Sequence, residues 1–290
     1  MKRWQRDYGL AMRMFLTMFL LFAVYIAFIG VLSYLRVPLG MIVIFAGVML
    51  FAQYYYSDKM VLYSTGARVV TESEEPGLHE IVSRLCIEAD LPKPRVAVVN
   101  SSIPNAFATG RSPKKAVVAV TTALMQKLDR NEVSAVLAHE LTHVKNRDVM
   151  VLTIASFFST IAFFLVRYLI FFAGDRRGGG QIMLAWVASI AVWLVSYLLI
   201  RALSRYREFA ADRGAAIITG HPSHLVSALM KISGSMDRVP TEDLRKAEGM
   251  NAFYIIPISK SSIMALFSTH PSLEKRVAAL EKISREMELA

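Results

Sequence analysis

The sequence is poor in cysteine and in charged residues, and each shortage excludes a class of protein. One cysteine, Cys86, cannot form an internal disulfide, so the chain is not a disulfide-rich secreted domain and suits a reducing compartment. Charged residues make up 19% of the chain, below the roughly 25% of soluble domains. Acidic residues are the scarcer kind, because 23 Asp and Glu stand against 33 Lys and Arg. An ordinary soluble protein is therefore not the first expectation.

Long uncharged runs take the place of the missing charge. Hydrophobic residues make up 54% of the chain, and the mean hydropathy is +0.42. A helix needs roughly 20 residues to cross a hydrocarbon core about 30 Å thick. Four runs approach or exceed this length: Met14–Leu35, Val37–Ser57, Val149–Val166 and Gly178–Ile200. We therefore predict an integral membrane protein with four spans, at about 14–35, 37–57, 149–173 and 179–200.

Two features of these runs bear on their assignment. The first run is longer than the 7–15 apolar residues of a signal peptide and lacks a small-residue cleavage site, so it is expected to remain as an anchor. Arg167 lies in the distal half of the third span, where it must either snorkel to the interface or face the interior of the helix bundle.

The net charge of +10 is explained by membrane topology and does not require a nucleic-acid partner. Lysine and arginine flank the first span and are frequent in the two long polar regions. Because cytoplasmic loops carry the excess of positive charge, the N-terminus and both polar regions are predicted to be cytoplasmic. The expected location is the plasma (inner) membrane, with the short turn near Arg36 and the loop Gly174–Gly180 outside.

The chain divides into alternating membrane and polar segments. Residues 1–57 and 149–200 each form a pair of spans, and 58–148 and 201–290 are expected to pack together as one cytoplasmic domain. Within that domain the patterns predict the following elements: helices over Pro76–Asp90 and from Thr122, strands at Arg95–Val99 and Ala116–Val120, an extended segment at Asn105–Gly110, a long helix capped by Asp129 or Asn131, and a final helix over Leu273–Met287. We expect the long helix to continue directly into the third span.

The long helix carries the segment "HELTH". His139 and His143 are four residues apart, so they lie one turn apart on one face and are able to share a metal ion. Glu140 lies beside that face, where a general base would take a proton from water. The alternative is a solvated or capping pair of histidines. A third ligand decides between them, and the candidates are Glu208, Asp212, His221, His224 and His270.

Among these candidates, Glu208 and Asp212 are also four residues apart, in "RYREFAADRGA". Because this segment follows the fourth span directly, the chain has returned to the side of the membrane that holds His139. Glu208 is placed to bind the metal and Asp212 to accept a hydrogen bond from a ligand histidine. An ordinary surface salt-bridge cluster is the alternative for both carboxylates.

Four motifs in order give the chain a family resemblance: "PNAFATG", "HELTH", "REFAAD" and "STHPSLEKRVAAL". The set resembles the membrane-bound zinc endopeptidases of the HtpX type, which are related to the CAAX prenyl endopeptidases. The resemblance covers nearly the whole chain. It implies one zinc ion per chain bound by His139, His143 and Glu208, with Glu140 as the catalytic base and Asp212 supporting a ligand.

Further roles follow from the same resemblance. Asn105, Ala106, Phe107, Ala108 and Thr109 would form an edge strand that pairs with the substrate backbone. His270 would stabilise the oxyanion, with capping of the final helix as its alternative, and Arg276 would pair with a carboxylate.

The predicted fold is a mainly α integral membrane protein with four spans and a cytoplasmic zincin-like α+β domain that contains a small β-sheet. The predicted function is zinc-dependent cleavage of misfolded or damaged membrane proteins, a quality-control and stress-response role that the resemblance implies. Two alternatives remain, which are a selective processing peptidase and a non-catalytic zinc-binding membrane protein. An inert Glu140 would favour the second of these.

Overall fold

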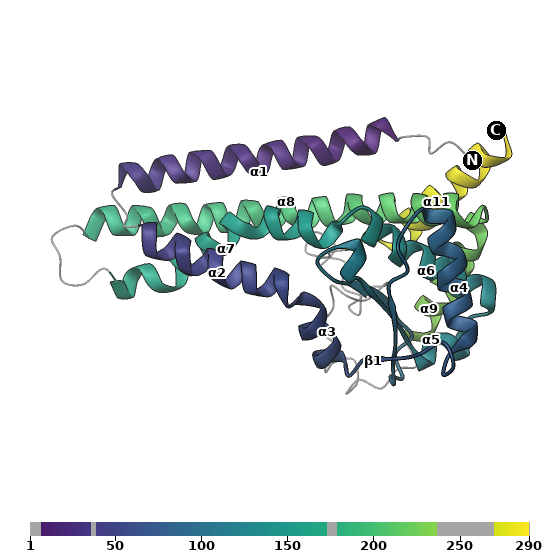
Figure 1. Cartoon of the computed structure of the whole chain (residues 1–290). Helices are drawn as coiled ribbons and strands as arrows, with labels where there is room; N and C mark the ends of the chain where they lie inside the picture. The colour runs from purple at the N-terminus through teal and green to yellow at the C-terminus, as the bar shows by residue number, and fades with distance from the viewer. Residues whose placement is uncertain (1–6, 36–38, 173–178, 237–269, 290) are drawn as a thin grey trace. The chain divides into compact units, whose positions relative to one another are not determined.

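The computed structural model describes residues 7–35, 39–172, 179–236 and 270–289 (Figure 1). The chain forms two compact units, each built from separate stretches of sequence. The first unit contains Tyr56–Val149 and the described residues from Arg207 onward. The second contains Arg6–Tyr55 and Met150–Tyr206. The loop predicted between the third and fourth spans lies almost wholly outside the described residues, as does the turn near Arg36.

Three of the described helices are long and apolar enough to cross a membrane. They are α1 (Tyr8–Tyr34), α7 (Asp148–Phe172) and α8 (Gly179–Thr219), the last of which runs without interruption for 41 residues (Figure 1). The remaining predicted span forms α2 (Leu39–Tyr55), whose 17 residues are fewer than a span usually needs. A membrane protein is thus supported by three helices, and the count of four spans stays a prediction.

The second unit has a buried interior and an apolar surface. Phe28, Leu32 and Leu165 are buried, and the Tyr25 hydroxyl donates a hydrogen bond to the Ala155 carbonyl oxygen at 2.6 Å. Large apolar side chains elsewhere on α1 are exposed, including Phe22 at 62%. Extensive exposed apolar surface is unfavourable in water, so it marks a face that contacts lipid or another apolar partner.

A four-stranded sheet lies in the first unit. Its strands are β1 (Arg68–Val69), β2 (Arg95–Val99), β3 (Ala106–Thr109) and β4 (Val117–Thr121), in the order β1-β2-β4-β3. The pair β2–β4 is parallel, and the other two pairs are antiparallel. The predicted strands are confirmed, with the start of β4 one residue later than expected. Strand β3 is the last in the order, so one of its edges has no strand beside it among the described residues.

The helices of this unit pack around two buried apolar clusters. The helices are α3 (Ser57–Thr65), α4 (Pro76–Ala89), α5 (Thr122–Lys127), α6 (Arg130–Lys145), α9 (Pro222–Met236) and α11 (Leu273–Glu288), with a 3₁₀ turn at Pro113–Lys115. Residues from α4, α6, α9 and α11 share the larger cluster with β2 and β4, and the smaller cluster contains Val61 of α3. The larger cluster therefore holds α6, which carries "HELTH", and every residue from Glu132 to Thr142 is buried.

The two ends of α6 have clear causes. At its start, Asp129 accepts hydrogen bonds from the backbone N–H groups of Asn131 and Glu132, and Glu132 accepts one from Asp129 in return. This capping box confirms the predicted cap. The prediction that α6 continues into the third span is wrong. The helix ends at Lys145, Arg147 adopts φ 54°, and α7 begins at Asp148.

Helix α8 approaches α6 closely at Gly214. A Cβ atom at this position would clash with Thr142 Cγ2 and Oγ1, closer than atoms approach without strain. Gly214→Ala should therefore destabilise the protein by about 1–3 kcal/mol through overpacking. The measurement is the melting temperature of the detergent-solubilised protein.

Two further variants make this test specific. Thr142→Ala in the Gly214→Ala background removes the two shortest contacts and should recover part of the loss. Gly77→Ala is the matched control, because a Cβ there meets nothing within 4 Å. It should leave stability unchanged or raise it. An unaltered melting temperature in Gly214→Ala would contradict the close approach.

Candidate metal centre

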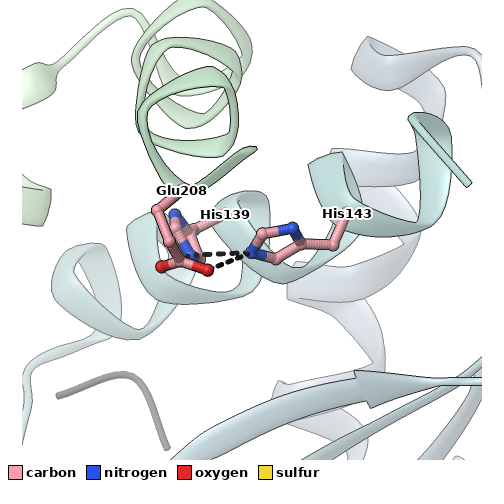
Figure 2. Close-up of side chains that lie close together, drawn as sticks. All are labelled: His139, His143 and Glu208. Carbon is pink, nitrogen blue, oxygen red and sulfur yellow. Dashed lines mark hydrogen bonds and ion pairs between the residues drawn. The ribbon is translucent and has the colours of Figure 1, made fainter. Parts of the chain in front are cut away.

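Helix α6 presents two histidines from successive turns. His139 is almost completely buried, at 1% exposed, and the His143 side chain is 19% exposed. Figure 2 shows both imidazole rings directed to the same place, where the Glu208 side chain enters from α8. The core position of α6 fixes the backbone of this face, so the rings are held before any ligand arrives.

One ligand atom from each of three residues converges at this place. The atoms of His139, His143 and Glu208 all lie within 4.8 Å of one another, and we call these residues the His–His–Glu group. His139 Nε2 lies 3.6 Å from Glu208 Oε2, and His143 Nε2 lies 3.4 Å from Glu208 Oε1. The two Nε2 atoms are 3.1 Å apart. Among the described residues, this is the one group with such a convergence.

Each histidine has its own carboxylate on the opposite ring nitrogen. His139 Nδ1 lies 2.9 Å from Asp212 Oδ1, and His143 Nδ1 lies 2.7 Å from Asp148 Oδ2. An ionised carboxylate only accepts hydrogen bonds, so the His143 Nδ1 proton points to Asp148. The Asp212 carboxylate favours a proton on His139 Nδ1 through a close contact that lacks hydrogen-bond geometry. In a neutral ring the Nε2 atom then keeps its lone pair. The two lone pairs face each other and the Glu208 carboxylate.

Two facing nitrogen lone pairs beside a carboxylate are stabilised by a proton or a metal cation between them. Burial would lower the pKa of His139 and of His143, but Asp212 and Glu208 outweigh it at His139 and Glu208 does so at His143, so both pKa values are raised. In addition, Glu208 Oε2 is buried and makes no contact of hydrogen-bond geometry among the described residues, with His270 Nδ1 3.1 Å away. Two imidazole nitrogens and one carboxylate form the donor set that catalytic zinc sites use, so the residues fit a zinc ion.

Glu140 lies beside the group and is held by the sheet. Its Oε2 atom accepts a hydrogen bond from the backbone N–H of Ala108 in β3, at 3.0 Å. Burial raises the pKa of the Glu140 carboxyl, while positive charge on His139 and His143 acts in the opposite direction. A carboxylate with a raised pKa next to a metal-binding group is suited to accept and return a proton.

Most of the other predicted site residues lie close to the His–His–Glu group or on β3, and two of the candidate ligands do not belong to the group. Asn105–Thr109 occupies β3 and the residue before it, and His270 Nδ1 lies 3.1 Å from Glu208 Oε2. Arg276 donates two hydrogen bonds to Asp212, from Nε at 2.8 Å and from Nη2 at 2.6 Å. The remaining candidate ligands, His221 and His224, stack on each other and do not belong to the His–His–Glu group.

Sequence reasoning missed two charged residues at the site. Asp148 contacts His143, and Arg207 forms an ion pair with Asp148. The spacing of five residues between His143 and Asp148 places them on different faces of a continuous helix, so periodicity hides the contact. Asn146 is a residue type that often terminates helices, and its presence could have indicated that α6 ends before Asp148.

Family comparison agrees with this geometry. The model of peptidase family M48 matches residues 72–284, a range that contains the whole His–His–Glu group. The chain belongs to peptidase family M48. It is therefore a metalloprotease, a hydrolase of peptide bonds, and its apolar helices make it a multi-pass membrane member of the family.

Curated relatives cover the chain from end to end. "Protease HtpX homolog 2" of Methanosarcina acetivorans is 65% identical over 291 residues, which are 99% of each chain. "Protease HtpX homolog" of Moorella thermoacetica is 60% identical over 97% of each chain. The resemblance to HtpX-type proteases is thus confirmed for this M48 chain.

A solved structure shares the fold. The crystal structure of S. mikatae Ste24p matches with a TM-score of 0.59 at 17% identity. The match covers 89% of this chain and 62% of Ste24p, so this M48 chain spans less than two thirds of that structure. The likeness at this identity concerns the fold alone.

Proposed function

We propose that this chain is a membrane-embedded zinc endopeptidase that binds one zinc ion through His139, His143 and Glu208. The observation that carries the proposal is the convergence of two imidazole lone pairs and a buried carboxylate, with Glu140 alongside. A zinc ion at such a site supplies Lewis acidity, which polarises a peptide carbonyl and makes water nucleophilic at neutral pH.

The side chains around the group divide the remaining work. Glu140 removes a proton from the attacking water and returns it to the leaving amine nitrogen, and the Ala108 N–H group keeps its carboxylate in position. Asp212 holds His139 in the tautomer that leaves Nε2 free to bind metal. His270, buried beside Glu208, is the proposed donor to the oxyanion that forms when water attacks.

The substrate is proposed to bind as an added strand along β3. Ala106 and Ala108 pair with Val120 and Val118 in the antiparallel register. The Asn105 carbonyl accepts from Thr121 N–H, so alternate residues of β3 bond to β4. Ala106 and Ala108 therefore direct their backbone groups away from β4, as the contact from Ala108 to Glu140 requires. Ala108 N–H already binds Glu140, so an extended peptide would pair with the Ala106 backbone groups and the Ala108 carbonyl, next to the general base.

The membrane arrangement is proposed from charge and length. Helix α2 would reach about 25 Å at 1.5 Å per residue, which spans a slightly thinned bilayer and completes four spans. The excess of lysine and arginine places the N-terminus and the catalytic unit in the cytoplasm, with the protein in the plasma membrane. The proposed substrates are misfolded or damaged membrane proteins that reach this face of the bilayer.

Metal removal and return test this function. The protein is purified in detergent with a chelator, zinc is restored stepwise, and digestion of unfolded casein is followed. We expect no cleavage without metal and full activity at about one zinc ion per chain. Bound zinc with no cleavage of casein would favour a selective processing peptidase or a non-catalytic zinc protein. Cleavage that persists after zinc is removed would refute the proposal.

A further inference from the structure

The junction between α6 and α7 brings an unassigned carboxylate to a proposed zinc ligand. In a continuous helix, Asp148 would lie about 140° around the axis from His143, because each residue turns the helix by about 100°. The left-handed backbone of Arg147, with φ 54°, breaks the helix and redirects the chain. Asp148 then reaches His143 Nδ1 at 2.7 Å.

Asp148 is itself held by a buried arginine. Arg207 forms an ion pair with Asp148 Oδ1 and donates a hydrogen bond from Nη2 to the Asn146 carbonyl oxygen at 3.0 Å. Arg207 and Asp148 are 5% and 6% exposed. One arginine thus binds both the carboxylate and the backbone of the break. Arg207 directly precedes Glu208 in α8, so adjacent residues supply a metal ligand and the group that fixes the junction.

The second histidine has an equivalent arrangement. His139 faces Asp212, and Asp212 receives two hydrogen bonds from Arg276. Each imidazole therefore contacts one carboxylate through Nδ1, and each carboxylate is bound by one arginine. Both histidines lie on α6, but Asp148 lies at the start of α7 and Asp212 lies on α8, so the likeness between the two sets does not follow from one repeated local motif.

We propose that Asp148 is the positioning residue of His143 and that Arg207 holds Asp148 in place. The proposal rests on the proposed zinc function of His143. By accepting the Nδ1 proton, Asp148 fixes the ring tautomer and orientation, so that Nε2 faces Glu208 without a search over rotamers. Partners of this kind typically change metal affinity by about 10- to 100-fold when they are removed.

The test measures zinc affinity directly on the full-length protein in detergent. Zinc is titrated against a fluorescent chelator for the wild type, Asp148→Ala, Asp148→Asn and Arg207→Met. We expect about 10- to 100-fold weaker binding in Asp148→Ala. Asp148→Asn should recover part of the loss, because its amide oxygen still accepts the Nδ1 proton, and Arg207→Met should fall between them. Cobalt-substituted protein gives a second readout, since an altered absorption spectrum reports a reoriented ligand.

Controls separate positioning from general damage. Asp58→Ala removes a carboxylate that pairs with Arg95 and should leave zinc affinity unchanged. A purely structural role for Asp148 would lower the melting temperature of the metal-free protein without weakening zinc binding by the folded protein, and this result would overturn the proposal. Zinc affinity within about twofold of wild type in Asp148→Ala would also overturn the proposal, because loss of a positioning partner should weaken zinc binding by at least about tenfold.

The proposed function can fail separately. A wild type that binds zinc and shows the expected losses, yet cleaves nothing, would support the positioning role and refute the peptidase function. A wild type that binds no zinc would overturn both.

Discussion

Glu140→Gln is expected to reduce casein cleavage by between about 10²- and 10⁴-fold, the usual contribution of a general base. The substitution keeps the shape of the side chain, and its amide oxygen can still accept the hydrogen bond from Ala108 N–H. It removes only the ability to take a proton from water. Glu140 does not belong to the His–His–Glu group, so zinc content should remain about one ion per chain.

A matched variant on the same helix controls for this change. Glu132 is also a buried glutamate of α6, and glutamine is an accepted residue at its position in the capping box. Glu132→Gln should therefore retain activity close to that of the wild type. Cleavage that survives Glu140→Gln at a normal rate would show that another group acts as the base. Loss of zinc in that variant would instead point to a ligand role for Glu140.

The helical parts of the site are the parts that the sequence can predict. A spacing of four residues fixes the common face of His139 and His143, and the same rule applies to Glu208 and Asp212. Sequence also indicates that "REFAAD" returns to the side of the membrane that holds α6. The contact between the two helices is tertiary, but the order of spans and polar segments makes it the expected one.

The helix break at Arg147 and the backbone hydrogen bond to Glu140 cannot be predicted from residue spacing. The left-handed conformation of Arg147 is set by local capping and by Arg207, which bonds to Asn146 across 61 residues of sequence, and no periodic pattern encodes it. The hydrogen bond from Ala108 to Glu140 uses a backbone N–H group, which every residue except proline carries. Composition and spacing therefore give no signal for either contact.

Length and hydropathy predict the apolar helices of the chain, but they do not predict where α2 ends. Runs of apolar residues define a span well when the helix and the run have nearly the same bounds, as in α7, predicted over 149–173 and found at Asp148–Phe172. In the second run, α2 ends at Tyr55 and a separate helix, α3, begins at Ser57. Asp58 in the first turn of α3 and the left-handed Gly66 at its end mark this helix as a distinct element.

The largest effect on stability is expected from Arg276→Met. Arg276 is 2% exposed and binds Asp212 through two hydrogen bonds, and Asp212 is completely buried. Removal of Arg276 leaves the buried Asp212 carboxylate with His139 as its remaining partner and without its full counter-charge, and breaking a buried ion pair costs about 3–5 kcal/mol. In a protein of this size the loss should lower the melting temperature by roughly 6–20 °C. The measurement is thermal unfolding in detergent with a chelator, so that bound metal does not mask the change.

A double variant tests whether the buried charge is the cause. Asp212→Asn together with Arg276→Met removes both charges, and a neutral amide costs less to bury than an unpaired carboxylate. The double variant should therefore be more stable than Arg276→Met alone. If the two losses simply add, the residues do not act as a pair. Recovery of stability without recovery of zinc affinity would separate the two roles of Asp212, because an amide restores neutrality but holds His139 less firmly than the carboxylate that Arg276 fixes.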